Sequence, residues 1–208
     1  MTRPVRVTPL GEIVAAPWRG SLMGNRGRLH DAAGQLGQAR WRSRAWIACR
    51  PAFRGRWRPI MPARGYTALF FWDEACAFAA GHRPCGECRH ADLMRFKAAW
   101  ASAGLPGRTA GEIDRVLHAA RIGPDGRQNR PTAAVQDHPS GAMMLAPDGA
   151  TPLLAWQGAL FAWGPEGYRP ASVASAHLPL LTPLPILEVL RAGYRPAIRL
   201  QATGAASF

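Results

Sequence analysis

Four cysteines carry the most specific chemical signal in this 208-residue chain. Cys85 and Cys88 form the motif C-G-E-C, and the other two are Cys49 and Cys76. A C-x-x-C turn that contains glycine and directly precedes a predicted helix can aim two thiolates at one zinc ion, which prefers cysteine sulfur and histidine nitrogen as ligands. A redox pair is the chemical alternative, but it normally lies in a thioredoxin-like strand–helix–strand pattern, which the sequence does not show. The spacing therefore predicts a Zn²⁺ site on Cys85 and Cys88.

The segment around this motif resembles a known family. Residues 70–89, FFWDEACAFAAGHRPCGECR, resemble the end of the N-terminal metal-binding domain of Ada, the bacterial methylated-DNA repair and regulatory protein. Residues 49–51, Cys-Arg-Pro, resemble the turn that supplies the other two zinc ligands in that family, and the resemblance covers about residues 40–90. It implies that Cys49, Cys85 and Cys88 bind zinc. It also implies that Cys49 stands where the Ada thiolate accepts a methyl group from a DNA phosphotriester.

The fourth ligand of this site is open. Where the family has its second upstream cysteine, this sequence has Phe53. The side chains that can replace it are those of Cys76, His30, His82 and His90. His30 precedes Asp31, whose carboxylate can orient the second ring nitrogen of a metal-bound histidine, so His30 joins the predicted ligand set. Cys76 lies on the apolar side of a predicted helix, where a free cysteine is normally a buried small residue.

Positive charge is concentrated in the first third of the chain. Residues 1–66 hold 13 arginines against Glu12 and Asp31, whereas residues 67–208 contribute little to the formal net charge of +13. Clustered cations gain affinity for polyanions by releasing phosphate counterions. The asymmetry favours a nucleic-acid partner, and the resemblance to Ada favours DNA over RNA.

The arginines of this region alternate with other residues in a period of two. This pattern predicts two strands, about residues 40–49 and 53–58, which can pair as a β-hairpin with the arginines on one face. The predicted nucleic-acid-binding residues on that face are Arg40, Arg42, Arg44, Trp46, Arg54, Arg56 and Arg58. The arginines are expected to contact phosphates and Trp46 to stack on an unpaired base. Trp41 and Trp57 fall on the opposite, buried face.

Other elements must position these residues. The apolar run at residues 66–72 predicts a buried strand, and a short helix follows over residues 73–80, which Gly81 ends. A second helix follows Cys88 and ends at Gly104. A third begins with the capping box of residues 109–112 and ends near Ala120.

The rest of the chain predicts a second, smaller unit. Residues 122–140 are polar and rich in turn formers, which favours a linker. Strands at about 142–146, 153–156 and 159–163 predict an antiparallel meander, and a last helix follows Thr182-Pro183. The expected fold class is α+β, with an Ada-like zinc-knuckle module that contains a β-hairpin and helices at residues 1–130 and a small antiparallel β-rich domain with a C-terminal helix at residues 131–208.

These features predict a zinc-stabilised nucleic-acid-binding protein that acts in DNA repair or regulation. The alternative is a metal-dependent enzyme acting on nucleic acid, with Cys49 as an alkyl acceptor or with His30 and His118 as the acid–base or metal residues of a phosphodiesterase. No cysteine follows residue 88, which excludes an Ada-type alkylguanine transferase domain here. No apolar run reaches the roughly 18 residues of a membrane helix, and no export signal is recognisable, so we expect a cytoplasmic location and no membrane partner.

Overall fold

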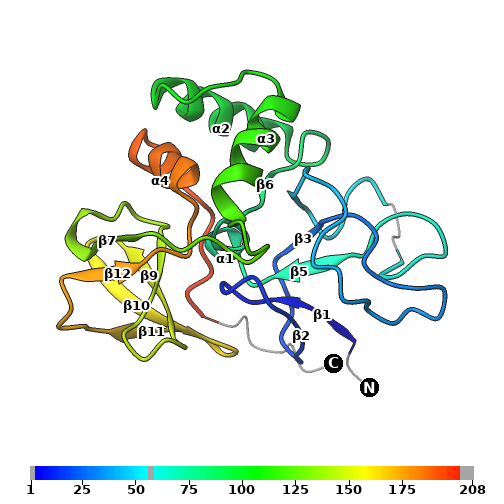
Figure 1. Cartoon of the computed structure of the whole chain (residues 1–208), viewed down its shortest axis with the longest axis horizontal. Coiled ribbons are helices and arrows are strands. Elements are labelled where there is room, and N and C mark those ends of the chain that lie inside the picture. Colours follow the sequence, from blue (N-terminus) through cyan, green and yellow to red (C-terminus); the bar gives the residue numbers. More distant parts are fainter. Residues whose placement is uncertain (1–2, 56–58, 202–208) are drawn as a thin grey trace.

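The computed structural model describes residues 3–55 and 59–201, which form an α+β fold. A six-stranded mixed sheet carries the first part of the chain, in the order β2-β1-β5-β3-β4-β6 (Figure 1). Its strands are β1 (Pro4–Val7), β2 (Ile13–Ala15), β3 (Leu22–Asn25), β4 (Ile47–Cys49), β5 (Leu69–Phe71) and β6 (Arg83–Pro84). Strand β1 runs parallel to β5 and β4 runs parallel to β6, whereas the other pairs are antiparallel.

The predicted arginine hairpin is wrong for the residues that the structure describes. Only β4 is a strand within residues 40–49, and residues 53–55 are irregular. Both edges of β4 are already occupied, by β3 on one side and β6 on the other, so no edge is left for a hairpin partner. Arg54 and Gly55 also adopt left-handed φ values of 52° and 66°, which interrupt an extended strand. The predicted binding residues Arg56 and Arg58, like Trp57, lie outside the described residues.

The predicted meander is confirmed. Strands β8 (Met143–Leu145), β9 (Pro152–Trp156), β10 (Ala159–Gly164) and β11 (Gly167–Ala171) form an antiparallel sheet in the order β11-β10-β9-β8. A separate pair joins β7 (Thr132–Ala134) to β12 (His177–Pro179), and a 3₁₀ turn, η1 (Val135–Asp137), follows β7. Strand β7 therefore lies inside the segment predicted to be a linker.

The helices of the described residues lie near their predicted positions. They are α1 (Glu74–Ala79), α2 (His90–Ser102), α3 (Ala110–Arg121) and α4 (Leu184–Arg191). Only α1 and α3 have a side-chain cap; α4 has none, because the Thr182 hydroxyl accepts a hydrogen bond from the Met143 amide instead. The Asp73 side chain caps α1 by accepting a hydrogen bond from the Cys76 amide, and Thr109 forms the expected capping box with Glu112. Gly81 ends the α1 turn at φ 82°, and a Cβ there would lie 2.6 Å from the Cδ of Arg121. Glycine thus allows the end of α3 to pass close to this turn.

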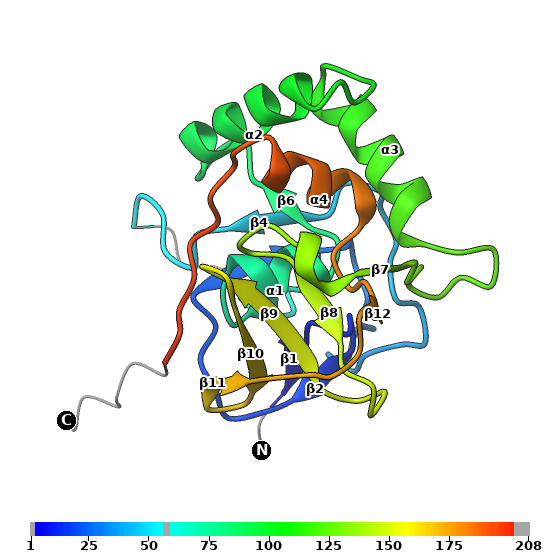
Figure 2. The same ribbon diagram turned by 90° about the vertical axis from the view of Figure 1, so that its left-hand side faces the viewer.

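Two of the three hydrophobic clusters among the described residues use side chains from both halves of the chain, and the third, smaller one contains Cys49, Cys85 and Cys88. The first packs side chains of α2 and α3, such as Phe96, with β8 and α4, for example Met144. The second packs β5 and α1, including Phe71, with the meander, including Leu154. Figure 2 shows the meander below the layer of α2, α3 and α4. The boundary predicted near residue 130 therefore does not separate two independent cores. Within the described residues, no helix is long and apolar enough to span a membrane.

Candidate metal centre and the arginine-rich surface

Three of the four cysteines come together at one end of the six-stranded sheet. Cys49 is the last residue of β4, Cys85 follows β6, and Cys88 precedes α2. Parallel pairing of β4 with β6 places Cys49 beside Cys85, and the Cys85 amide extends this ladder by donating to the Ala48 carbonyl at 3.0 Å. The Sγ atoms of the three cysteines all lie within 4.8 Å of one another, and each residue is buried. Their arrangement can hold a metal ion.

Backbone amides supply hydrogen bonds to the sulfur atoms. The Glu87 amide donates to Cys85 Sγ at 3.4 Å, and the Arg50 amide donates to Cys88 Sγ at 3.3 Å. The pKa of Cys85 is lowered to about 5, mainly because the Cys49 thiol donates a hydrogen bond to its sulfur. The same hydrogen bond, together with burial, raises the pKa of Cys49, and burial raises the pKa of Cys88. The protein therefore stabilises negative charge on at least one sulfur of the cluster.

Buried ion pairs fix both ends of the C-x-x-C turn. Arg83, two residues before Cys85, donates from Nε and Nη2 to the two carboxylate oxygens of Asp114 at 2.9 and 2.7 Å. Arg89, directly after Cys88, donates to Glu74 at 2.6 Å and to Asp92 at 2.7 Å. These pairs tie the turn to α3, α1 and α2. Arg83 and Arg89 flank the motif in the sequence and were the available signal for this supporting role. The sequence pattern alone did not assign the role to them.

The structure does not bring His30 into the metal centre. Its Nδ1 lies 2.6 Å from the Thr67 hydroxyl and its Nε2 lies 2.9 Å from the Pro62 carbonyl, so both ring nitrogens have other partners. Asp31 does not orient this ring, because its carboxylate caps the turn at Gln35. Among the described His, Cys, Asp and Glu residues, the three cysteines form the only group of this kind.

The other candidates for the fourth ligand also have separate surroundings. Cys76 is fully buried, as predicted, and its sulfur lies 3.4 Å from the Tyr168 hydroxyl. His82 lies between the rings of Trp46 and Phe71, and the pKa of this imidazole is lowered, mainly by burial. The exposed His90 has its Nδ1 3.2 Å from the Gly86 carbonyl. Among the described residues, the group that could hold a metal ion therefore consists of Cys49, Cys85 and Cys88.

His118, the remaining catalytic candidate, lies on α3 against a different set of side chains. Its ring contacts Trp41 at a centroid distance of 4.4 Å, and its Nδ1 lies 3.1 Å from Arg121 Nη2. Burial lowers the pKa of His118. Because His30 and His118 have different partners, the structure does not join them into one metal-ligating group.

The predicted position of Trp46 on an exposed face is wrong. Trp46 is only 3% exposed, and its indole N–H donates to the Ser43 carbonyl at 2.8 Å. The guanidinium carbons of Arg26 and Arg121 lie 4.2 and 3.9 Å from its ring centroid. The residues before Ile47 are not a strand, so the period-two rule that placed Trp46 beside the exposed arginines does not apply.

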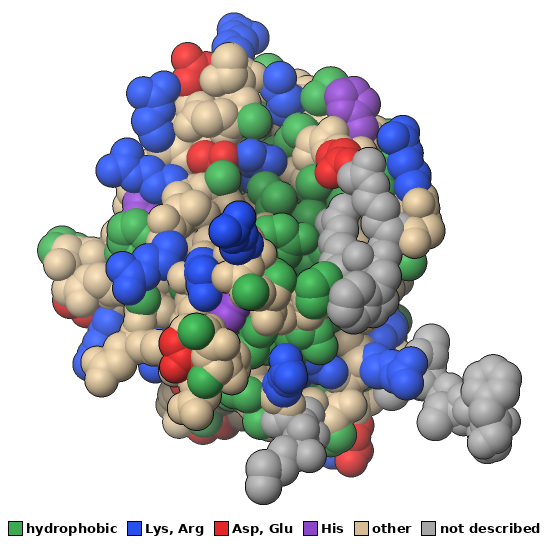
Figure 3. Space-filling model, turned by 90° about the vertical axis from the view of Figure 1, so that its right-hand side faces the viewer, with side chains coloured by type: hydrophobic (Ala, Val, Ile, Leu, Met, Phe, Trp, Pro, Cys, Tyr) green, Lys and Arg blue, Asp and Glu red, His purple; other side chains and the backbone are tan. Residues whose placement is uncertain are grey.

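The described arginines of the predicted binding set are exposed. Arg40, Arg42, Arg44 and Arg54 form no ion pair with a carboxylate among the residues that the structure describes. Figure 3 shows the side of the molecule that carries these loops, where Lys and Arg side chains are spread around a hydrophobic centre. We use the name arginine-rich surface for the exposed Arg42, Arg44, Arg50 and Arg54, which precede and follow β4 in the sequence. Arg50 directly follows Cys49, so this surface is continuous in sequence with the metal centre.

Comparison of the chain with models of protein families, with curated proteins and with solved structures found no match.

Proposed function

We propose that this protein binds Zn²⁺ through Cys49, Cys85 and Cys88 and uses the arginine-rich surface to bind nucleic acid, DNA in preference to RNA, in DNA repair or regulation. The observation that carries the proposal is the meeting of three buried cysteine sulfurs at the end of β4, where the exposed Arg50 directly follows Cys49 in the sequence. The resemblance to the Ada metal-binding domain over residues 40–90 supports the same assignment.

The donor set favours zinc over harder cations. Thiolates select soft or borderline metals, whereas Mg²⁺ and Ca²⁺ prefer oxygen ligands. An ion held by Cys49, Cys85 and Cys88 would crosslink β4 to the turn that leads into α2. Because those segments are far apart in the sequence, metal binding would contribute directly to the folding free energy of this region.

The arginine-rich surface suits a phosphate backbone better than a protein surface of mixed charge. Arginine side chains that lack an internal carboxylate partner remain available for bidentate hydrogen bonds to phosphate oxygens. Such contacts position nucleic acid without reading its sequence. The affinity should therefore fall steeply as the salt concentration rises.

The three-ligand set also favours a second candidate function, in which Cys49 accepts an alkyl group. Zinc sites that do chemistry keep three protein ligands and one open position, which matches the ligands found here. In this reaction Cys49 would first lose its thiol proton to solvent. The Cys49 thiolate would then attack the methyl carbon of a DNA methyl phosphotriester, so that the carbon–oxygen bond breaks, an S–CH₃ bond forms at Cys49 Sγ, and the phosphodiester anion leaves with the electron pair. The phosphodiesterase alternative would need His30 and His118 in one site, whereas the two histidines contact different residues.

Metal analysis of purified variants tests the zinc assignment. We expect about one equivalent of zinc in the wild-type protein, and loss of this zinc in Cys49→Ser, Cys85→Ser and Cys88→Ser. Cys76→Ser is the matched control, because Cys76 lies outside the cluster, and it should keep the metal. Zinc that survives in the Cys49 variant but not in the Cys85 variant would remove Cys49 from the site.

Titration of labelled DNA and RNA at several salt concentrations tests the binding surface. The triple variant Arg42→Ala/Arg44→Ala/Arg54→Ala should bind more weakly and lower the slope of log K against log salt by about 0.9 for each phosphate of duplex DNA that it no longer neutralises. The control Arg108→Ala/Arg115→Ala/Arg169→Ala removes the same charge from exposed positions elsewhere. Equally weakened binding in both variants would show that the arginine-rich surface is not the binding site.

Mass spectrometry of the Cys49 peptide, after incubation with DNA that carries a methyl phosphotriester, separates binding from alkyl transfer.

A further inference from the structure

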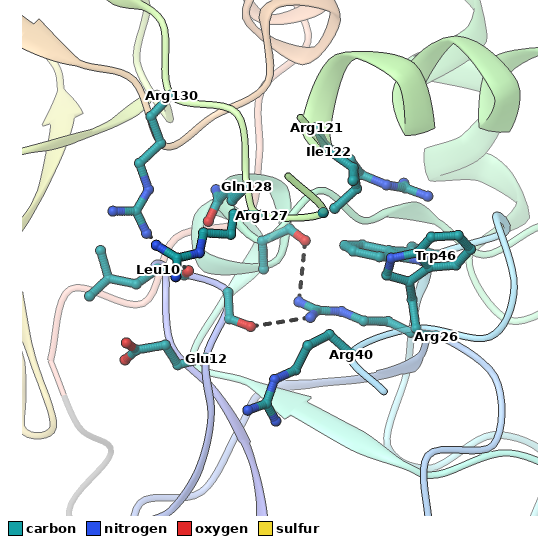
Figure 4. A pocket seen from close by; sticks show the side chains of 14 residues that line it. Leu10, Glu12, Arg26, Arg40, Trp46, Arg121, Ile122, Arg127, Gln128 and Arg130 are labelled. Carbon is teal, nitrogen blue, oxygen red and sulfur yellow. Dashed lines mark hydrogen bonds between the residues drawn. The ribbon is translucent and has the colours of Figure 1, made fainter. Parts of the chain in front are cut away.

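A pocket of about 250 Å³ lies away from the cysteine cluster, between the β1–β2 turn and the segment that follows α3. The residues that line it come from four parts of the chain, which are residues 10–12, residues 26–46, Ala80 and residues 121–130, and Figure 4 shows their side chains. Five of the lining residues are arginines, and Glu12 is the only acidic residue that lines the pocket. The lining therefore carries a strong positive charge.

The deepest arginines are buried without a carboxylate partner. Arg26 is 2% exposed and Arg121 is 1% exposed, and neither forms an ion pair with a described acidic side chain. Arg26 donates to the Gly11 and Ala80 carbonyls at 3.1 and 3.4 Å, as the dashed lines in Figure 4 mark. Arg121 donates to the Gly81 and Arg44 carbonyls at 2.7 and 2.6 Å. A buried cation with neutral hydrogen-bond partners only is costly. Burial lowers the pKa of Arg121, but Asp114 lies close enough to act in the opposite direction on that guanidinium, so Arg26 is the residue that would gain most from a bound anion.

The pocket lining also contains polar atoms with no partner in the protein. The Nε atoms of Arg26, Arg121 and Arg130 are buried and make no hydrogen bond with described residues. Gln128 Oε1 is also buried without a hydrogen-bond partner. The side-chain nitrogen of Gln128 donates to the Ala79 and Leu181 carbonyls. Buried polar groups of this kind are rare in native proteins and normally have a specific partner. Here the residues that carry these unpaired donors and this unpaired acceptor all line one pocket.

Exposed cations and apolar side chains complete the site. Arg40 and Arg127 are exposed and line the pocket at its solvent side, whereas Leu10, Trp41 and Ile122 are half-buried and give it an apolar wall. Burial, with a smaller effect from Arg40, lowers the pKa of Arg26 to about 9, so this guanidinium remains charged near neutral pH. A small ligand that combines an anionic end with an apolar or flat end fits both parts of the lining.

We propose that this pocket binds a phosphate monoester attached to a flat, hydroxyl-bearing group, as in a 5′-nucleotide. Guanidinium groups match the phosphate oxygens in bidentate geometry, so a phosphate would supply the missing counter-charge of the buried Arg26 and would also pair with the exposed Arg127. The apolar wall with Trp41 would contact the flat group, and Gln128 Oε1 would accept a hydrogen bond from a hydroxyl. The same phosphate chemistry is offered by a free nucleotide and by the 5′-phosphorylated end of a nucleic-acid strand.

The pocket shares no lining side chain with the two sites of the proposed function, although the backbones of Arg42 and Arg44 bond to the pocket residues Arg26 and Arg121. The arginine-rich surface of Arg42, Arg44, Arg50 and Arg54 does not line the pocket, and neither does the cysteine cluster. Weaker nucleic-acid binding in the Arg42→Ala/Arg44→Ala/Arg54→Ala variant, with ligand binding in the pocket retained, would show that the two sites act independently.

Isothermal titration of the full chain with AMP, adenosine and inorganic phosphate tests the pocket. We expect AMP to bind at least about tenfold more tightly than adenosine, because the phosphate adds charge-assisted hydrogen bonds. Arg127→Ala removes an exposed pocket cation and should weaken AMP binding by about tenfold or more without affecting the fold. Arg115→Ala, an exposed arginine of α3 outside the pocket, is the matched control and should leave the affinity unchanged. Arg26→Gln probes the buried cation, and a thermal melt shows whether that variant remains folded.

Oligonucleotides with a 5′-phosphate or a 5′-hydroxyl identify the source of the phosphate. If the phosphorylated strand binds more tightly than the hydroxyl strand, and Arg127→Ala abolishes the difference, the pocket binds a strand end. If AMP alone shows the Arg127 dependence, the ligand is a free nucleotide. Equal affinity for AMP and adenosine, together with equal affinity for the two oligonucleotides, would overturn the proposal, as would phosphate-dependent binding that Arg127→Ala leaves unchanged.

Discussion

The guanidinium carbon of Arg121, the last residue of α3, lies 3.9 Å from the centroid of the Trp46 ring. Arg26 places a second guanidinium 4.2 Å from the same centroid, and the Trp46 carbonyl accepts a hydrogen bond from the Arg83 amide at 3.0 Å. Trp46 thus lies between two sites: its ring lines the arginine pocket, and its backbone enters β4, which ends at Cys49. The tryptophan that the sequence pattern placed on an exposed face is a structural link between the pocket and the metal centre.

Replacing Trp46 by alanine should therefore lower the free energy of unfolding by about 3–5 kcal/mol, the range for loss of a large buried aromatic side chain. Two buried guanidinium groups would also lose their aromatic partner. Chemical denaturation measures the change. Trp41→Ala is the control, because Trp41 is only half-buried, and a destabilisation as large as that of Trp46→Ala would contradict the central position of Trp46.

Local sequence signals predicted the helices and the meander, because caps and tight turns depend on neighbouring residues. The Thr109–Glu112 capping box and Gly81 are examples. The six-stranded sheet could not be predicted in this way. Strand β4 pairs with β3 and β6, which lie far from it in sequence, and these partners occupy the edges that a hairpin would need. The alternation of arginines with other residues therefore reflects composition and does not indicate strand geometry in the described part of this segment.

The candidate site was also predictable only in part, because some of its contacts join residues that are distant in the sequence. The spacing of Cys85 and Cys88, with the resemblance to Ada, indicated the cluster that the structure forms with Cys49. The hydrogen bonds of His30 to Thr67 and Pro62 depend on a distant segment, so its surroundings could not be inferred from the neighbouring Asp31. No local pattern indicates the arginine pocket, because its lining comes from four separate parts of the chain.

Metal removal should loosen the connection between β4 and α2. Treatment of the zinc-loaded protein with a strong chelator is expected to lower its melting temperature, because a ligand that binds only the folded state stabilises it. Cys88→Ser should melt below the wild type and show no further decrease with chelator, whereas the Cys76→Ser control should respond like the wild type. An equal response of Cys88→Ser and the wild type would rule out a stabilising metal at this cluster.

The ion pair between Arg83 and Asp114 should be important for stability, because both side chains are nearly inaccessible, at 6% and 7% exposure. Asp114→Asn leaves the Arg83 charge buried without a counter-charge and should cost about 3–5 kcal/mol of unfolding free energy. The double variant Arg83→Met/Asp114→Leu should lose less, since it removes both charges. Neutralising the exposed pair of Glu188 and Arg191 by Glu188→Gln is the control and should cost less than about 1 kcal/mol. A double variant less stable than Asp114→Asn would contradict this account.

The buried carboxyl of Asp73 should make stability depend on pH between about 4 and 6. One of its oxygens accepts hydrogen bonds from the Cys76 amide and the Tyr168 hydroxyl, and the other accepts one from the Arg199 amide. Burial nevertheless dominates and raises the pKa of Asp73 from 3.8 to about 6. The folded protein therefore binds a proton at higher pH than the unfolded chain does. The contribution of this carboxyl to the free energy of unfolding is fully present below about pH 4 and is lost as the pH rises through about 6, a change of about 3 kcal/mol.

Asp73→Asn isolates this contribution, because asparagine keeps an oxygen that can cap α1 and does not titrate. Denaturation curves of the wild type and the variant, recorded from about pH 4 to about pH 8, give the difference in unfolding free energy as a function of pH. Other titrating groups are common to both proteins and cancel in this difference. We expect the wild type to lose stability relative to the variant as the pH rises through about 6, with the change complete near neutral pH. If the difference in unfolding free energy does not vary with pH, or varies in the opposite direction, the three hydrogen bonds to the Asp73 carboxylate outweigh the effect of its burial.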